Sequence, residues 1–382
     1  MRPAVTTRLQ LSLAMCLLFA GAGQGRADPG ERGAGEQVAG KGAGHTLRLE
    51  GIPPPLVPEL CPPDLHCPAV LGGWEGPLPP SYLKLSLPEQ AAGEQPFDSG
   101  SGGAPSSLRR RLGGAIGTAG FYGALYAWAY FAWYRGQKKN ESIMIRWEGA
   151  FGGDTYGGGA DKLGHYFSSY AIARGTTEFL VYMGWKPWFA TLLGGLLSLT
   201  WFTAIELKDG MHLGYGFSPE DMIANTLGVL TSALMYLWPG FDDLIDVRLY
   251  YRPSKPFTHE LLVKKNVDVA EDYTGSTYMM AFRLMGVPAI RHTRWLRPLR
   301  YIDLLVGYNA RGFLPRPKDG RWRDRELFFG FGLNLMAILE DVAPGTRLYK
   351  TINVMQEFFH LTPVARFVRF RAYNAQPAKK GH

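Results

Sequence analysis

The sequence has none of the short motifs that mark familiar enzymes and nucleotide-binding folds. It contains no Gly-x-Ser-x-Gly nucleophile elbow, no phosphate-binding loop, no His-Glu-x-x-His pair and no dinucleotide fingerprint. Internal repeats are also absent. The glycine pairs Gly113-Gly114 and Gly194-Gly195 are more typical of close helix packing than of phosphate binding. No contiguous motif therefore assigns an activity.

Features typical of nucleic-acid binding are missing as well. The net charge is +8, but the basic residues are scattered, with short clusters at Arg109–Arg111 and between Arg291 and Arg325. No recognition helix, zinc-finger spacing or ribonucleoprotein motif accompanies them. The pattern argues against a nucleic-acid partner and favours a membrane-proximal protein whose basic residues face anionic head groups.

Cysteine is scarce, with three residues in the chain. Cys16 is a poor site for lipid attachment, because Met15 precedes it where a small residue is needed. Cys61 and Cys67 remain, and oxidising conditions outside the cytoplasm favour a local disulfide between them. The alternative is that the two cysteines bind a metal together with His66.

The N-terminal segment has the pattern of a signal peptide. Arg2 and Arg8 precede an apolar stretch, Leu9 to Gly23, that is short for a membrane-spanning helix. Small residues then lead to Ala27. We expect export and removal of residues 1–27.

The remaining sequence divides by composition into three regions. Residues 28–107 are rich in glycine and proline and cannot bury enough apolar area to fold, so they are predicted to be a linker. Residues 108–240 carry the long apolar segments. Residues 241–382 are mixed in character and predicted to be rich in β-structure.

Four apolar segments occupy the middle region: Leu112–Tyr134, Leu163–Met183, Trp188–Leu207 and Met222–Trp238. Each approaches the roughly 20 residues needed to cross a membrane, and Trp and Tyr near their ends suit its interfaces. Only the first is unambiguous, since the other three are short or polar enough to be helices of a soluble bundle or half-inserted helices.

The C-terminal region combines strand patterns with one amphipathic helix. The segments Tyr278–Leu284, Tyr301–Tyr308 and Glu326–Leu339 read as strands, and residues 346–360 place apolar side chains at helical period. The predicted fold class is mainly α. An apolar, membrane-associated bundle of about four helices is followed by a small antiparallel β unit and a C-terminal amphipathic helix.

Ionisable residues gather at the ends of the apolar segments. Asp161 and His165 share a helix face, because they are four residues apart. Glu206 and Asp209 are one turn apart at the end of the third segment. Asp221 lies near the start of the fourth. Charged groups in apolar surroundings are usually paired, bound to metal or functional.

Two interpretations of this cluster remain open. In the structural one, Ser218 and Asp161 are helix N-caps, Asp221 and Asn225 share a face, and His165 bonds to another helix. Lys162 then lies at the surface. In the functional one, the carboxylates and the imidazole bind a divalent metal or act as an acid–base pair.

Three motifs in order resemble a known family. They are Asp161-Lys162-Leu163-Gly164-His165, Glu206-Leu207-Lys208-Asp209-Gly210 and Gly216-Phe217-Ser218-x-x-Asp221-x-x-x-Asn225-x-x-Gly228. This segment resembles the uncharacterised family of predicted periplasmic lipoproteins and is more distantly similar to VanZ-like membrane proteins. The resemblance implies an envelope location and a helical core, but no activity.

The sequence thus predicts an exported, membrane-associated envelope protein that binds an envelope lipid or glycan through its polar cluster. One alternative is a hydrolase or transferase acting on phospholipid or cell-wall precursors, with Asp161, His165, Glu206, Asp209 and Asp221 as its candidate site. Another is a scaffold whose strands pair with an outer-membrane protein.

Overall fold

The computed structural model describes residues 107–375, apart from residues 154, 213–214, 265–268 and 315–321. The expected signal peptide, the glycine- and proline-rich linker and the pair Cys61 and Cys67 lie outside the described residues.

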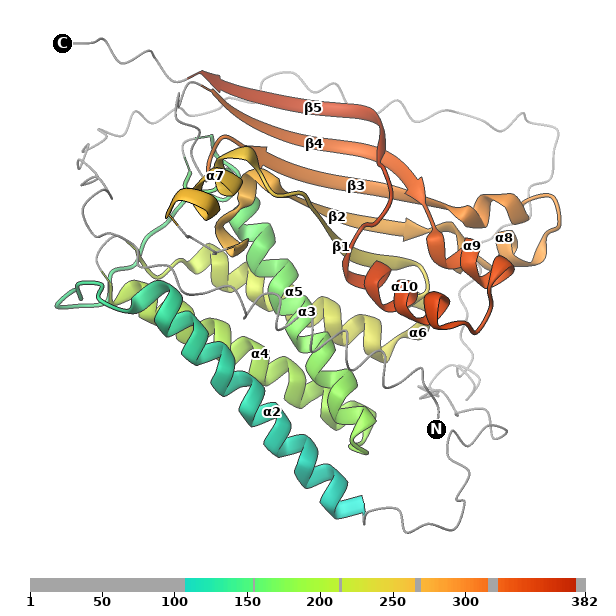
Figure 1. Ribbon diagram of the computed structural model, residues 1–382, viewed down its shortest axis with the longest axis horizontal. Helices are drawn as coiled ribbons and strands as arrows, with labels where there is room; N and C mark the ends of the chain where they lie inside the picture. Colours follow the sequence, from blue (N-terminus) through green and yellow to red (C-terminus); the bar gives the residue numbers. More distant parts are fainter. Residues whose placement is uncertain (1–106, 154, 213–214, 265–268, 315–321, 376–382) are drawn as a thin grey trace, which may run out of the picture. The chain divides into compact units, whose positions relative to one another are not determined.

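Four long helices occupy the segments where the sequence predicts them (Figure 1). Helix α3 packs against each of the other three. A short π-helical turn, Tyr130–Tyr134, extends α2. The bounds are α2 Ser107–Ala129, α3 Ala160–Tyr182, α4 Pro187–Gly210 and α5 Pro219–Leu237.

Glycine permits the close approach of these helices. A methyl group added at Gly228 of α5 would lie 2.2 Å from the carbonyl oxygen of Tyr166 in α3. One added at Gly194 of α4 would lie 2.6 Å from Oγ1 of Thr177 in α3. The packing role predicted for the second glycine pair is therefore confirmed at Gly194.

Length and apolar character single out one helix. Within the described ranges, α4 alone is long and apolar enough to cross a membrane, and 39% of its most apolar stretch is buried inside the protein. Helix α3 has crossing length but carries charged residues, among them Lys162, Arg174 and Glu178. Its central position in the bundle explains how it accommodates them.

The C-terminal half is built on a five-stranded antiparallel sheet in which strand order equals chain order. The strands are β1 Ile245–Tyr251, β2 Ser276–Arg283, β3 Ile302–Arg311, β4 Trp322–Leu333 and β5 Ala365–Ala375. Shorter helices flank them: α6 Pro239–Asp242, α7 Lys255–Lys264, α8 Pro288–His292, α9 Leu335–Val342 and α10 Arg347–Phe358.

Two details of the predicted β region are wrong. The third predicted strand ends at Leu333, because Asn334 caps a new helix by accepting a hydrogen bond from the backbone of Ala337. The amphipathic helix over residues 346–360 exists as α10, but it is not terminal, since strand β5 follows it. Strands β1 and β5 were not predicted at all.

Helix α3 connects the two halves. Its Phe167 and Tyr170 pack with Val247 and Leu249 of β1 and with Phe358 of α10 in one buried cluster. This packing brings the start of α3 next to the loop that precedes β2, where the polar cluster is completed.

Candidate functional site

A glycine turn sets the start of helix α3 and hence the position of Asp161. Gly158 and Gly159 adopt left-handed backbone conformations, with φ of 61° and 89°, which glycine reaches without strain. Gly159, not Asp161, is the N-cap residue, so the predicted capping role of Asp161 is wrong. Its carboxylate instead accepts a hydrogen bond of 2.6 Å from the hydroxyl of Tyr273.

The start of helix α5 matches its sequence pattern. The Ser218 hydroxyl accepts a hydrogen bond of 3.2 Å from the backbone of Asp221, and Pro219 occupies the first turn. The backbone N–H of Ser218 donates to Glu206 Oε2 at 3.0 Å. The end of α4 is thereby fastened to the start of α5.

His165 lies where three helices meet. Its Nε2 is 3.7 Å from Glu206 Oε1 of α4 and 3.9 Å from Asp161 Oδ1 of its own helix. Its Nδ1 is 3.3 Å from Asn225 Oδ1 of α5. The structure thus brings together side chains that are distant in sequence.

Lys162 is the residue that sequence reasoning misplaced. It is 6% exposed, not at the surface. Its ammonium group lies 2.9 Å from carboxylate oxygens of both Asp161 and Asp221 and 2.5 Å from Glu148. Glu148 was not predicted either, because it precedes the helices in a stretch without periodic pattern. One cation therefore serves three carboxylates.

Asp209 lies beside this cluster with a partner of its own. It accepts a hydrogen bond of 2.9 Å from the Tyr134 hydroxyl at the end of the α2 extension. The ring of His212 packs against Tyr134, and its Nδ1 donates to the Lys208 carbonyl at 2.6 Å. We define the polar cluster as Glu148, Asp161, Lys162, His165, Glu206, Asp221 and Asn225.

Burial and charge shift the pKa values of the cluster in opposite ways. Burial lowers the pKa of His165, but the carboxylates of Asp221, Asp161 and Glu206 outweigh it and raise the pKa to about 8. Burial raises the pKa of Glu206 to about 8, although His165 opposes the shift. Burial likewise raises the pKa of Asp209 to about 7. These groups hold protons near neutral pH.

The polar cluster contains atoms that could bind a metal, but the Lys162 ammonium group already lies beside them. Single ligand atoms of Asp161, His165 and Asp221 lie within 4.8 Å of one another, close enough to share an ion. The Lys162 ammonium contacts both carboxylates of that set. A divalent ion would have to displace it, so the cluster fits a metal poorly as it is built.

Two features of the polar cluster are not explained by bonds between its own residues. The His165 side chain is 20% exposed, whereas that of Glu206 is 2% exposed. The buried amide nitrogen of Asn225 has no hydrogen-bond partner among the described residues. A buried polar group without a partner is costly, which makes this point of the cluster a candidate for ligand contact.

The cluster coincides with the part of the chain that has known relatives. Residues 147–237 match the family described as predicted periplasmic lipoprotein (DUF2279). The match supports an exported, cell-envelope location and gives no evidence for a VanZ-like relationship. No curated protein and no solved structure matches the chain.

Proposed function

We propose that this protein is a membrane-associated component of the cell envelope, and that the outer faces of α2, α4 and α5 contact lipid. The supporting observation is a set of large apolar side chains that point outward on all three helices; Leu230, for example, is 58% exposed. The set comprises Leu108, Leu112, Ile116, Trp188, Leu192, Leu196, Ile223, Leu227, Leu230, Leu234 and Leu237.

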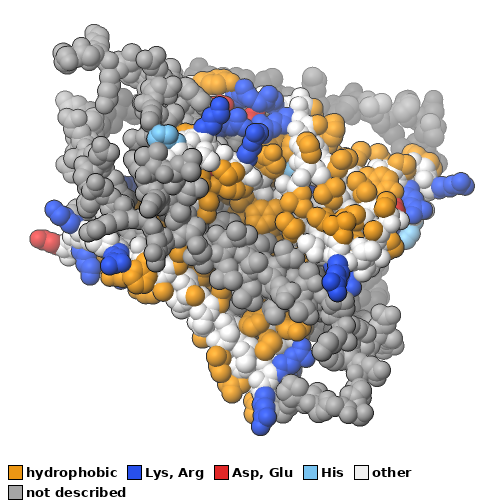
Figure 2. Space-filling model, viewed as in Figure 1, with side chains coloured by type: hydrophobic (Ala, Val, Ile, Leu, Met, Phe, Trp, Pro, Cys, Tyr) orange, Lys and Arg blue, Asp and Glu red, His pale blue; other side chains and the backbone are white. Residues whose placement is uncertain are grey.

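Eleven exposed large apolar side chains on three helices are unusual for a water-facing surface. Soluble monomers rarely expose contiguous apolar patches larger than a few hundred Å². Figure 2 shows hydrophobic side chains along the outer face of α2, with Lys or Arg side chains at the end where the helix begins. A helix with an apolar outer face and basic residues at one end suits a membrane with anionic head groups.

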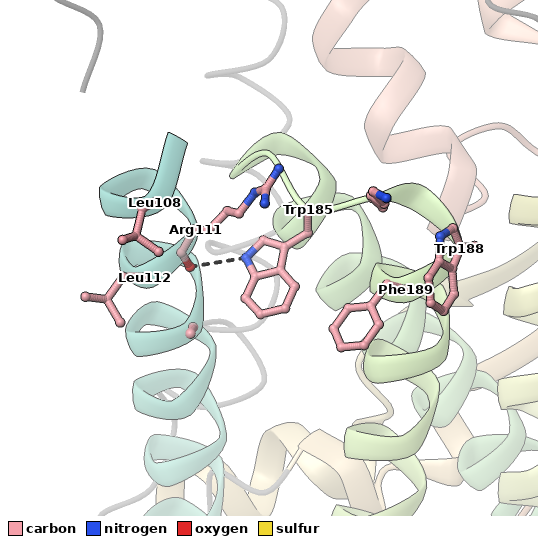
Figure 3. Close-up of a pocket in the computed structure, with 8 residues that line it drawn as sticks. Leu108, Arg111, Leu112, Trp185, Trp188 and Phe189 are labelled. Atoms are coloured by element: carbon pink, nitrogen blue, oxygen red, sulfur yellow. Dashed lines mark hydrogen bonds between the residues drawn. The ribbon is translucent and has the colours of Figure 1, made fainter. Parts of the chain in front are cut away.

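A groove between α2 and α4 also suits contact with an anionic lipid. It has a volume of about 480 Å³ and is lined by Leu108, Leu112, Trp185 and Phe189, among others. Figure 3 shows Trp185 reaching from the α3–α4 turn towards α2, where its ring nitrogen donates to the Arg111 carbonyl at 3.1 Å. The side chains of Arg111 and Lys186 also line it. An acyl chain in the groove would place a phosphate near these two cations.

Vesicle flotation of the full-length protein tests the membrane proposal. We expect it to float with phosphatidylcholine vesicles and more completely when phosphatidylglycerol is added. Leu196→Asp combined with Leu230→Asp should abolish flotation, because two charges would enter the apolar phase. Val342→Asp is the matched control, since Val342 is 76% exposed in the other half. Equal loss in both variants would refute the proposal.

A second candidate function, hydrolysis or group transfer on phospholipid or cell-wall precursors, rests on the exposed edge of His165. In this proposal Glu206 and Asp161 orient the His165 imidazolium. As water or an acceptor hydroxyl attacks the phosphorus, the imidazolium donates its proton to the leaving oxygen, and the proton lost by the nucleophile returns to the imidazole. The purified protein would be incubated with phospholipid or with undecaprenyl diphosphate, and products followed by mass spectrometry. His165→Gln should abolish turnover while the variant remains folded, as circular dichroism checks. Turnover that survives the substitution would exclude this role for His165.

A further inference from the structure

The C-terminal half contains a second cavity, which is distant in sequence from the polar cluster. Its volume is about 780 Å³. Its wall is formed by the end of β1, the start of α7, the start of β2, the end of β3 and one residue of β5. The lining residues that carry the argument are Arg252, Lys255, Thr277, Arg311 and Arg366.

Among the described residues, the lining is basic and contains no acidic residue. Four of its side chains are cationic, namely Arg252, Lys255, Arg311 and Arg366. Arg366 is paired with buried Glu326 at 2.5 Å. For Arg252, Lys255 and Arg311, no carboxylate lies within ion-pair distance in the part of the chain that the structure describes. The described lining therefore carries four positive charges and no negative one, while the buried acids Glu326 and Asp272 contact its wall.

The wall is held rigid from behind. Buried Asp272 accepts hydrogen bonds from the backbone of Ser254 at 2.9 Å and of Gly275 at 3.0 Å, two residues that line the cavity. The Ser254 hydroxyl in turn accepts one of 3.1 Å from the backbone of Phe257 in the first turn of α7. The loop that supplies Arg252 and Lys255 is thus fixed, together with the loop at Gly275, before any ligand arrives, which lowers the entropy cost of binding.

Repulsion among the arginines also favours the binding of an anion. Burial lowers the pKa of Arg366, and Glu326 opposes that shift. Arg311 and Arg371 lower the pKa further, because their charges repel the guanidinium. Arg369 and Arg371 also contact Glu326, so this one acid is shared among three arginines. A bound anion would relieve the repulsion.

We propose that this cavity binds a phosphate-bearing ligand with at least two negative charges, such as a phosphorylated glycan or a lipid head group. Guanidinium groups match phosphate through paired N–H donors, and Thr277 and Tyr250 supply hydroxyls to the same wall. The volume lies in the usual range of small-molecule sites, roughly 300–1,000 Å³. The inference goes beyond the membrane proposal, because its site shares no residue with the apolar surface.

Calorimetric titration of the full-length protein in detergent tests the proposal with sodium pyrophosphate as the probe. Sodium chloride at equal ionic strength is the blank. Arg252→Gln combined with Arg311→Gln should weaken binding by roughly tenfold or more, since both charge-assisted hydrogen bonds to phosphate are lost. Lys138→Gln combined with Lys139→Gln removes the same charge at an exposed loop and should leave affinity unchanged.

Two further arms identify the source of the phosphate. Glucose 1-phosphate represents a phosphorylated glycan, and cardiolipin in nanodiscs represents a lipid whose head group carries two phosphates. Binding of either that is lost in the Arg252/Arg311 variant supports the proposal and names the source. Should the arginine variant misfold, Lys255→Gln alone serves in its place. Pyrophosphate binding that is absent, or equally strong in the arginine variant, would overturn it, whatever the outcome of vesicle flotation.

Discussion

At the scale of single residues, the cluster depends on one ammonium group. Lys162 lies between Asp161, Asp221 and Glu148, all of them shielded from solvent. A buried carboxylate without a counter-ion is strongly destabilising, so loss of this cation should affect all three acids at once. The position that would admit a divalent metal is the position that Lys162 fills.

Lys162→Met should therefore lower the free energy of unfolding by about 3–5 kcal/mol, the usual cost of breaking a buried ion pair. Chemical denaturation measures it, with Lys139→Met at an exposed position as the control. We also expect Mn²⁺ to raise the melting temperature of Lys162→Met but not that of the wild type. A wild-type protein that Mn²⁺ stabilises equally would contradict the view that Lys162 replaces a metal.

The raised pKa values of His165 and Glu206, both about 8, predict a pH-dependent stability. The ordinary values are 6.5 for histidine and 4.5 for glutamate. Between pH 6.5 and 8 the folded protein holds protons that the unfolded chain releases, so the free energy of unfolding falls as pH rises. The melting temperature, measured across this range by calorimetry, should decline less steeply in Glu206→Gln. An unchanged slope in that variant would refute the assignment.

At the scale of elements, helices α3 and α5 are held at a distance that only glycine permits. Gly228 faces the carbonyl of Tyr166 and the hydroxyl of Ser169, each 2.2 Å from where a methyl group would lie. Since the carbonyl belongs to backbone, it cannot rotate away. The spacing of these two helices in turn sets the contact between His165 and Asn225.

Gly228→Ala should push the helices apart and cost about 1–3 kcal/mol of stability, as overpacking does elsewhere. Gly175→Ala in α3 is a matched control, because nothing lies within 4 Å of its added methyl group. That control should stabilise the helix by up to about 1 kcal/mol, since alanine is the better helix former. Thermal unfolding of both variants distinguishes crowding from helix propensity, and similar effects would contradict the packing argument.

The elements also show what could be predicted from sequence. Apolar runs of helical length located α2 to α5, because burial in a bundle demands them. The convergence of His165 and Glu206 followed from their places at helix ends. Strand β1 was missed because its Asp246 and Arg248 are buried as an ion pair, which removes the apolar–polar alternation that identifies strands. Lys162 was misplaced because lysine is rarely buried unless paired, and its partners come from three separate segments.

At the scale of the whole molecule, a few long-range bonds join the helices to the sheet half. The Tyr273 hydroxyl bonds to Asp161, and that of Tyr308 donates to the Gly158 carbonyl. Arg174 in α3 contacts Glu357 of α10 at 2.8 Å. These links are polar and at least partly shielded from solvent, so we expect the two halves to unfold together.

Tyr273→Phe removes the hydrogen bond to Asp161 and keeps the aromatic ring. It should lower the free energy of unfolding by about 1–3 kcal/mol, because the buried Asp161 carboxylate loses a donor. Tyr126→Phe, at an exposed position of α2, is the control. Calorimetry should show one transition in the wild type. Two separate transitions in the wild type would contradict the coupling of the halves.

The order of the strands bears on how the protein reaches this state. Each strand pairs with its immediate neighbour in the chain, so the sheet can grow strand by strand, although helices lie in several of the connections. The contact between Asp161 and Tyr273 closes a loop of 112 residues. Its hydrogen bond adds no stability until the structure around both residues has folded. We expect this bond to form after the rate-limiting step, so that its loss accelerates unfolding and leaves the refolding rate nearly unchanged.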